Sequence, residues 1–377
     1  MEINVDKIAE DCIKAINEKI RNLKTLNIIV AGKTGVGKST LINGVFRENL
    51  VETGMGKPVT MHMRKISKQD FPLNIYDTRG FELGKDAQTE VKKEIIEIIH
   101  KGIVSKDVNE SIHCIWYCIN TASNRVEQEE IDWLKDFANE NKLTQVPIII
   151  VLTQAFSKRR VKEMRDMILN ENLDVIQVIP VLAMDYDIDD EYVAKAYGLD
   201  TLIKVMSEVL PTELQDTLQN VQKASLEEKK RYAQTAVATA TAAAFGEGFS
   251  PIPFSDCALL IPTQVAMIAS ITAIFGLDIN KSIITAFVSS TIGAGGATIA
   301  GRTIVSNLLK LIPGAGTVTG GSISGATAGM LTTALGEAYI LMMEAVYKGE
   351  LSSSEINTDI GKKKMKELFK ERIKVNK

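Results

Sequence analysis

The sequence predicts an α/β fold, a mostly parallel sheet with helices on both faces, joined to an all-α C-terminal domain. Short β-branched runs alternate with charged helical stretches between about residues 25 and 210. Parallel strands need long crossover connections, so this alternation is typical of a parallel sheet covered by helices. Residues 245–335 differ, because they are rich in Gly, Ala, Ser, Thr and Ile and are nearly free of charge.

Length and composition limit the classes of protein to consider. The chain has 377 residues, too many for one ordinary core, so we expect two domains. A hydrophobic content of 45% and a charged content of 24% are normal for a globular protein, and the net charge of −3 gives no general attraction to nucleic acid. The three histidines are far apart in sequence, which argues against a histidine-centred catalytic site.

The cysteines and the N-terminus predict the compartment. The four cysteines show no zinc-ligand spacing, and we expect Cys114 and Cys118, in an apolar run, to be buried thiols suited to a reducing environment. The charged N-terminus lacks the apolar segment of a cleavable secretory signal. We expect a cytoplasmic location, with peripheral or integral attachment at the inner face of the cell membrane as an open alternative.

The N-terminal residues 1–24 predict a helix, because Ile8, Cys12, Ile16 and Ile20 recur at helical spacing with charges between them. We expect an accessory helix that packs on a neighbour, with a membrane-surface helix as the alternative. The strands predicted after it are 26–31, 61–66, 71–77, 112–119, 146–152 and 175–181. The helices predicted between them are 38–47, 86–101, 126–141, 158–170 and 188–209. Ligands bind such sheets at the carboxyl ends of the strands.

A phosphate-binding motif follows the first predicted strand. Residues 32–39 read GKTGVGKS, the pattern G-x-x-x-x-G-K-[ST], between a strand and a helix. The glycines let the backbone curl with its N–H groups facing phosphate oxygens, Lys38 reaches the β- and γ-phosphates, and Ser39 offers a hydroxyl to Mg²⁺. The alternative is a glycine turn that matches by chance. The residues expected to contact the nucleotide here are Gly32, Lys33, Thr34, Gly35, Val36, Gly37, Lys38, Ser39 and Thr40.

A second motif, Asp77-Thr78-Arg79-Gly80, follows the apolar run LNIY. A carboxylate at the end of a neighbouring strand holds Mg²⁺ through water, and the Gly80 N–H is free to meet a γ-phosphate. In the loop 54–60 we choose Thr60 over Thr53 as the residue that completes the metal shell in the triphosphate state, because it directly precedes a strand. An ordinary loop role for Thr60 stays open. The expected metal ligands are Ser39, Thr60 and Asp77, and the expected catalytic residues are Lys38, Thr60, Gly80 and Arg79.

Together, GKTGVGKS, Thr60 and DTRG resemble the Era-like (TrmE-Era-EngA-septin-like) branch of P-loop GTPases over residues 25–210. The wording of the first motif is close to that of septin-like and immunity-associated GTPases. The resemblance implies a G domain that binds Mg²⁺ and GTP, hydrolyses GTP to GDP and phosphate, and couples hydrolysis to a loop switch.

The base-reading motifs depart from that pattern. Such families end a strand in N/T-K-x-D, whose Asp binds guanine, whereas this chain has Thr153 and Gln154 and places Phe156 where the Asp would stand. This resembles degenerate variants in chloroplast-import and immunity-associated GTPases. The resemblance implies that Thr153, Gln154 and Ala183, the last in the S-A-K position, contact the base, and Asp185 is a candidate replacement carboxylate. An ATPase or small-molecule kinase remains a rival.

Catalysis also departs from the family pattern, because Phe81 stands where many GTPases place a water-orienting Gln. Phe cannot orient water by hydrogen bonding, so we expect slow hydrolysis without a partner or dimerisation. Arg79, Glu82 or a residue from a second subunit across the nucleotide are the candidates for the missing group.

The apolar C-terminal half carries a second resemblance. Residues 225–345 resemble an uncharacterised helical domain that is fused to bacterial Era-like GTPases and to some membrane proteins. The stretches 257–277, 282–301 and 311–336 are free of charge and long enough to span a bilayer, but prolines and glycines interrupt them. A spanning domain, reversible membrane association and a soluble bundle all stay open.

The predicted organisation is an accessory helix at 1–24, a G domain at 25–210, an apolar helical domain at 211–357 and a basic helix at 358–377. The expected partners are GTP and GDP, a second copy across the nucleotide face, and an anionic membrane surface met by the basic end. RNA or the ribosome is less favoured, because no aromatic–basic cluster is visible. A structural, membrane-interacting protein with little hydrolysis is the remaining rival.

Overall fold

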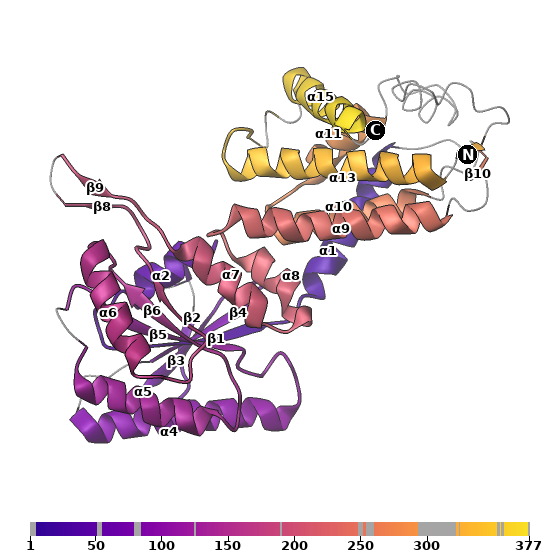
Figure 1. Ribbon diagram of the computed structural model, residues 1–377. Helices are drawn as coiled ribbons and strands as arrows, with labels where there is room; N and C mark the ends of the chain where they lie inside the picture. Colours follow the sequence, from indigo (N-terminus) through magenta and orange to yellow (C-terminus); the bar gives the residue numbers. More distant parts are fainter. Residues whose placement is uncertain are drawn as a thin grey trace. The chain divides into compact units, whose positions relative to one another are not determined.

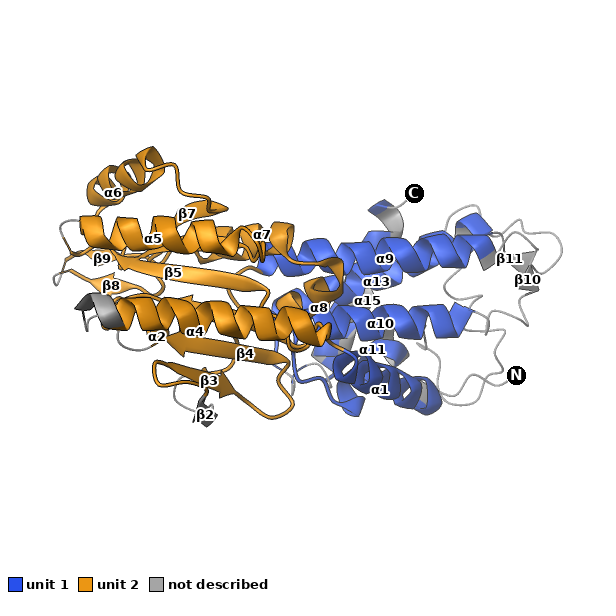
Figure 2. Cartoon of the chain, turned by 90° about the horizontal axis from the view of Figure 1, so that it is seen from below, with its two compact units in different colours: residues 1–22, 226–377 blue, residues 23–225 orange. Residues whose placement is uncertain are grey.

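The protein is described by a computed structural model that divides the chain into two compact units (Figure 2). The described residues are 5–50, 55–78, 84–123, 126–188, 191–247, 252–253, 260–292, 322–323, 325–352, 355 and 358–375. The sheet unit comprises residues 23–225, and the helical unit comprises residues 1–22 and 226–377. The predicted domain boundary near residue 210 therefore falls inside the sheet unit.

The sheet unit contains a seven-stranded sheet in the order β2-β3-β4-β1-β5-β6-β7. Its strands are β1 (Leu26–Ala31), β2 (Met55–Pro58), β3 (Met63–Ser67), β4 (Leu73–Thr78), β5 (Cys114–Asn120), β6 (Ile148–Thr153) and β7 (Gln177–Pro180). β1 and β4 to β7 are parallel, whereas β3 runs antiparallel to β4 and β2 antiparallel to β3. The predicted mostly parallel sheet is confirmed.

Helices cover both faces of this sheet (Figure 1). All six residues of β1 are buried, which explains its continuous apolar sequence. Ile28 and Val30 point into a core shared with α2 (Lys38–Val45), α7 (Leu199–Val209) and α8 (Thr212–Val221). Ile29 points the opposite way, into a core shared with α4 (Gly84–Ser105), α5 (Gln128–Asn141) and α6 (Lys158–Asn170).

Two predicted elements of this unit are partly wrong. The predicted helix 188–209 is confirmed over α7, but its first half contains β9 (Val193–Ala194), which pairs with β8 (Tyr186–Asp187) in a two-stranded hairpin. Gly198 starts α7 in the left-handed conformation, with φ of 86°, where a Cβ atom would collide with the carbonyl oxygen of Pro180. The predicted strand 61–66 begins at Met63, and β2 occupies part of the segment predicted as a loop.

The helical unit is built from six described helices and one short strand pair. They are α1 (Val5–Arg21), α9 (Leu226–Glu247), α10 (Leu260–Phe275), α11 (Lys281–Ile292), α13 (Gly325–Tyr347) and α15 (Asp359–Val375), with β10 (Ile252–Pro253) paired to β11 (Ser322–Ile323). The all-α prediction for this region is confirmed apart from that pair. Residues 222–225 separate α8 of the sheet unit from α9 of the helical unit.

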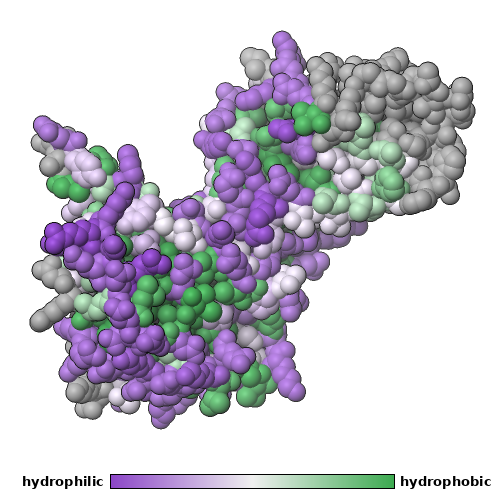
Figure 3. Space-filling model, in the orientation of Figure 1, coloured by the Kyte–Doolittle hydropathy of each residue, from purple (hydrophilic) through white to green (hydrophobic). Residues whose placement is uncertain are grey.

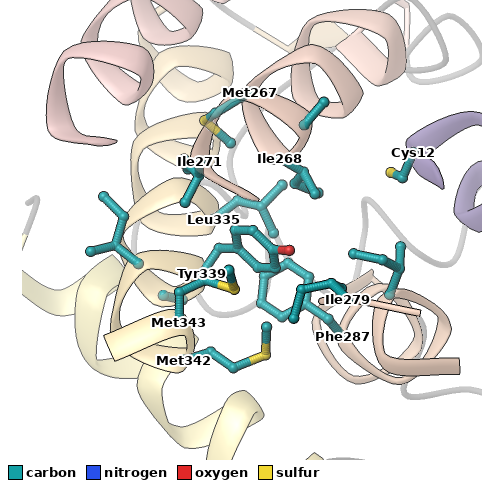
Figure 4. Close-up of a cluster of buried hydrophobic side chains, with 14 of the residues drawn as sticks. Cys12, Met267, Ile268, Ile271, Ile279, Phe287, Leu335, Tyr339, Met342 and Met343 are labelled. Carbon is teal, nitrogen blue, oxygen red and sulfur yellow. The ribbon is translucent and has the colours of Figure 1, made fainter. Parts of the chain in front are cut away.

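The core of the helical unit centres on Tyr339 (Figure 4). Its ring centroid lies 4.7 Å from that of Phe287, and its hydroxyl lies 2.7 Å from Thr272 Oγ1. At Gly336 a Cβ atom would lie 2.5 Å from Val237 Cγ2 and 2.8 Å from Met267 Sδ, so the glycine allows α13 to approach α9 and α10 closely. Cys12 of α1 is buried in the same core, which makes the N-terminal helix part of this unit.

The charge-free stretches 257–277, 282–301 and 311–336 are described only in part. Within the described part of the chain, no helix combines the length needed to cross a bilayer with sufficient hydropathy. Residues 293–321, which hold parts of two of these stretches, lie outside the described residues. In the sheet unit, Cys114 and Cys118 are buried free thiols, as predicted, and burial raises the pKa of each to about 12.

Candidate nucleotide site

The glycine-rich loop joins β1 to α2. Gly32 has φ of 137°, and a Cβ atom there would collide with the carbonyl oxygen of Cys118 on the neighbouring strand. Gly35 and Gly37 also have positive φ, 75° and 93°, and Gly37 is the residue at which α2 begins. The backbone therefore curls as the motif predicted, in conformations that favour glycine over every other residue.

Lys38 is the first residue of α2 and folds back over this loop. Its Nζ donates to the carbonyl oxygens of Gly32 at 2.8 Å and Lys33 at 3.0 Å. Ser39 and Thr40 follow in the first turn and are exposed. The positive end of the helix dipole and the first N–H groups of α2 face the same place as the ammonium group, an arrangement suited to an anion.

Thr153 and Gln154, expected to contact a base, also hold the phosphate loop in place. Thr153 Oγ1 donates to the carbonyl oxygen of Val36, and Gln154 Nε2 donates to that of Gly35 at 3.0 Å. Gln154 has φ of 51°, in the left-handed region that a non-glycine residue adopts rarely. The end of β6 therefore helps to hold the shape of the loop.

Asp77 lies at the end of β4, next to β1, in register with Val30. It is buried, and its Oδ2 accepts a hydrogen bond from Arg64 Nε at 2.9 Å, with Arg64 Nη2 also at 2.9 Å. Asp77 Oδ1 has no hydrogen-bond partner among the described residues. A buried carboxylate oxygen without a partner is a donor that fits Mg²⁺, directly or through water.

Thr60 lies in the turn between β2 and β3. Its hydroxyl donates to Glu94 Oε2 on α4 at 2.5 Å, and the same carboxylate contacts the backbone N–H and Nδ1 of His62. In this structure the Thr60 hydroxyl is therefore hydrogen-bonded to Glu94. A metal-binding role for Thr60 remains a prediction that requires this hydrogen bond to be exchanged.

Three of the predicted catalytic candidates lie outside the described residues. They are Arg79, Gly80 and Glu82, and Phe81, which stands in place of a water-orienting Gln, lies outside them too. Their roles remain predictions.

A pocket of about 190 Å³ lies beside the loop, where the base was expected. Thr153, Gln154 and Ala183, predicted to meet the base, are brought together in its lining with Phe156 and with Tyr186 of the β8–β9 hairpin. The candidate carboxylate does not line it: Asp185 binds Lys195 Nζ and the Ala196 N–H, each at 2.8 Å. Those hydrogen bonds, with the charge of Lys195, lower the pKa of the Asp185 carboxyl group despite slight desolvation.

Sequence reasoning missed four groups at this site, which are Glu127, Glu130, Arg64 and Glu94. Lys33 Nζ binds Glu127 at 2.7 Å and Glu130 at 3.2 Å. Desolvation lowers the Lys33 pKa, but hydrogen bonds and charge from the two glutamates more than offset it, so its pKa is raised. Only the register of β3 against β4 brings Arg64 to Asp77, and no sequence motif encodes that register.

Comparison with known families divides the chain in the same way as its composition. Residues 27–154 match the family described as "50S ribosome-binding GTPase", and residues 210–376 match a domain of unknown function, DUF697. The first match lies within the sheet unit.

Curated relatives match part of the chain. The tRNA modification GTPase MnmE of Ruthia magnifica is 29% identical over 106 residues, which are 28% of this chain and 23% of the relative. Septin-14 of Mus musculus is 21% identical over 196 residues, 47% of this chain and 44% of the relative. The chain therefore covers less than half the length of either protein.

Solved structures also resemble the chain. Toc33 of Arabidopsis thaliana in complex with Mg²⁺ and GMPPNP is 18% identical and covers 56% of this chain and 94% of its own, with a TM-score of 0.31. A probable GTP-binding protein engB is 19% identical and covers 48% and 97%, with a TM-score of 0.31. Scores this low carry no argument about function.

Proposed function

We propose that this chain, in which a P-loop GTPase domain is fused to a DUF697 helical domain, binds GTP with Mg²⁺ and hydrolyses it to GDP and phosphate. The observation that carries the proposal is the loop from Gly32 to Gly37, with Lys38 folded over its carbonyl groups at the start of α2. Asp77, one strand away, presents a buried oxygen with no partner in the described chain.

Each group at the site has a separate role in the proposed reaction. Lys38 exchanges its two carbonyl partners for β- and γ-phosphate oxygens, and the loop N–H groups hold the remaining charge. Ser39 and Asp77 Oδ1 would hold Mg²⁺, which when bound neutralises phosphate charge. Water attacks the γ-phosphorus in line with the bond to the β-phosphate bridging oxygen, which leaves with GDP. Arg79, Glu82 or a second copy supplies the group that orients the water.

We further propose that nucleotide state is transmitted from α2 to the helical unit along the chain. The support is a set of hydrogen bonds where α2 ends. Arg47 N donates to the carbonyl oxygen of Val221 at 2.9 Å, and Lys223 N donates to that of Val45 at 2.7 Å. Arg47 Nε also donates to the carbonyl oxygen of Asn220 at 3.0 Å. The segment 220–223 is thus fixed to the end of the phosphate-loop helix.

Buried polar side chains lie on both sides of this segment in the sequence. Gln222 Nε2 donates to the Ser225 carbonyl oxygen at 2.9 Å, and Ser225 N donates back to Gln222 Oε1 at 2.8 Å. Thr217 Oγ1 donates to the Lys24 carbonyl oxygen at 2.8 Å. Residues 24 and 225 lie where the chain enters and leaves the sheet unit, and α9 starts at Leu226. A shift of α2 therefore moves the segment that leads into α9.

Two finer elements belong to the proposal. The first is attachment to an anionic membrane surface through α15, whose described lysines Lys363 and Lys364 are exposed. The second is pairing of two copies across the nucleotide face, which would supply the missing catalytic group. Pelleting with anionic and neutral vesicles tests the first, and dependence of the specific hydrolysis rate on protein concentration tests the second.

Phosphate release from GTP by the purified full chain tests the proposed activity. We expect release that requires Mg²⁺ and falls by tenfold or more in Lys38→Ala, because charge-assisted hydrogen bonds of the lysine contribute roughly 1.5–3 kcal/mol. Lys135→Ala is the matched control, since Lys135 is paired on the surface with Glu171. Binding of GTP without hydrolysis at any protein or lipid concentration would favour the structural rival. Tighter ATP binding with phosphate transfer to a small molecule would favour the kinase.

A further inference from the structure

The rim of the base pocket carries two aromatic side chains from separate elements. Phe156 follows β6, and Tyr186 belongs to β8 of the hairpin. Their ring centroids are 4.4 Å apart and their planes are inclined by 44°. Phe156 is half-buried and Tyr186 is 48% exposed, so a planar ligand has access to both. The hairpin extends away from the sheet (Figure 1) and carries hydrophobic as well as hydrophilic residues (Figure 3).

The pocket offers few polar groups to a base. None of the described residues that line it is Asp or Glu. Thr153 Oγ1 and Gln154 Nε2 already donate to carbonyl oxygens of the phosphate loop. Asp185, the nearest acid in sequence, is turned to Lys195 and the Ala196 N–H. The lining is therefore mainly apolar, with Leu41, Val181, Leu182 and Met184 beside the two rings.

We propose that Phe156 and Tyr186 determine base specificity, holding a purine by ring contact, and that the 2-amino group of guanine is not read. This inference rests on the proposed function, because it assumes that a nucleoside triphosphate occupies the loop. Inosine triphosphate, which lacks only that amino group, then binds as tightly as GTP, and discrimination against ATP is small.

The physical reason lies in the number of acceptors. A carboxylate accepts hydrogen bonds from guanine N1–H and from the 2-amino group together, which strengthens the binding of guanine. When another base is bound, the carboxylate loses one or both of these donors. An aromatic ring interacts with the face of the base, and every purine presents a comparable π-face. With Phe156 in place of the acid, the protein contacts the face of the base and no longer hydrogen-bonds to its edge. A pyrimidine presents a smaller face and gains less.

Dissociation constants for GTP, ITP, ATP and CTP with Mg²⁺, measured by displacement of a fluorescent GDP analogue, test this directly. We expect GTP and ITP to agree within about threefold, ATP to lie within about tenfold of them, and CTP to bind more weakly than all three. A preference for GTP over ITP of about 30-fold or more overturns the inference, since the amino group is then read.

Three variants sharpen the test. Phe156→Asp should raise the ratio of GTP to ITP affinity by about tenfold, because it restores an acceptor for the amino group. Tyr186→Ala, at an exposed position that tolerates truncation, should lower the affinities for GTP and ITP by the same factor, about tenfold. Tyr192→Ala is the control, since Tyr192 lies on the same hairpin but does not line the pocket. The proposal is contradicted if Tyr186→Ala lowers the affinities for GTP and ITP by different factors.

Failure here is distinguishable from failure of the proposed function. If no nucleoside triphosphate binds, or if Lys38→Ala leaves all four affinities unchanged, the proposed function fails. If binding depends on Lys38 but GTP strongly exceeds ITP, the triphosphate site stands and only the ring-contact inference fails. Melting temperatures of each variant show whether a loss of affinity reflects unfolding.

Discussion

Arg64 holds one oxygen of Asp77, Oδ2, with its Nε and Nη2 both 2.9 Å away, and leaves Oδ1 without a partner among the described residues. The pair joins the antiparallel strand β3 to the end of β4. Two donors from one planar group fix the direction of a carboxylate better than one. We infer that Arg64 aims the second oxygen of Asp77 at the metal position.

Arg64→Leu should lower the free energy of unfolding by about 1–3 kcal/mol, because it leaves a buried carboxylate oxygen without its donors. It should also raise the Mg²⁺ concentration needed for half-maximal phosphate release. Urea denaturation and a Mg²⁺ titration measure the two effects. Arg159→Leu is the control, because that arginine is 88% exposed and pairs with a neighbour on its own helix, so the free energy of unfolding should change by less than about 0.5 kcal/mol. Equal changes in both variants would remove the special role of Arg64.

Glu94→Gln should increase the affinity for GTP relative to GDP. The carboxylate holds the Thr60 hydroxyl at 2.5 Å, and a neutral amide holds it less strongly, so Thr60 is freer to join the metal when a γ-phosphate is present. The expected increase in the ratio of affinities is about tenfold. Isothermal titration with GDP and a non-hydrolysable GTP analogue provides the ratio. Glu97→Gln, exposed on the same helix, should leave it unchanged. An unaltered ratio in Glu94→Gln would mean that Thr60 does not act as the switch ligand.

His113 should make the sheet unit less stable in mild acid. Burial lowers its pKa from 6.5 to about 4, and its Nδ1 accepts a hydrogen bond from the Asn27 N–H at 3.0 Å. Between these pH values the unfolded chain binds more protons than the folded one, so stability is fully present above pH 6.5 and is lost as the pH falls toward 4. The slope contributed is at most about 1.4 kcal/mol per pH unit.

Urea denaturation at pH 7, 6 and 5 measures this slope. His113→Asn keeps an acceptor for Asn27 but cannot titrate, so the slope should become flatter. His100→Gln, at an exposed position on α4, should keep the slope of the unaltered protein. A slope that persists in His113→Asn would assign the acid sensitivity to other groups.

Arg47→Ala should weaken the proposed transmission from α2 to α9. It removes the side-chain hydrogen bonds to Asn220 without touching the phosphate loop. We expect GTP-analogue affinity within about threefold of the unaltered protein and a smaller nucleotide-dependent change in hydrogen exchange of residues 226–247, because the backbone hydrogen bonds between the end of α2 and residues 221–223 remain. Arg165→Ala, which removes a hydrogen bond to the carbonyl oxygen of Val178 elsewhere in the sheet unit, is the control. If the exchange of α9 is indifferent to nucleotide in every variant, the helical unit is not coupled through this segment.

The sequence predicted the strongly patterned parts of the fold well. β1 and α6 have the predicted bounds, 26–31 and 158–170, because a fully buried strand and an amphipathic helix show clear periodicity. The phosphate loop was predicted for a different reason: its glycines are required by backbone conformations that the structure displays. Asp77 was located because it ends an apolar strand next to that motif.

The rest depends on pairing between distant segments. The β8–β9 hairpin has only two residues in each strand, which is too few for a periodic signal. Its Tyr186 contacts Phe156, which lies 30 residues earlier in the sequence. The partners of Thr60 and Asp77 lie on α4 and β3, at separations that no motif records. The split between α8 and α9 reflects the binding of residues 220–223 to the end of α2.

Equilibrium binding of a non-hydrolysable GTP analogue to the full chain is the most direct test of the central claim, that the loop from Gly32 to Ser39 holds a triphosphate with Mg²⁺ at Asp77. The account predicts one site per chain, with affinity reduced tenfold or more in Lys38→Ala and by removal of Mg²⁺. A folded, magnesium-supplied protein that binds no purine triphosphate at millimolar concentration, or that binds it equally well without Lys38, would contradict it.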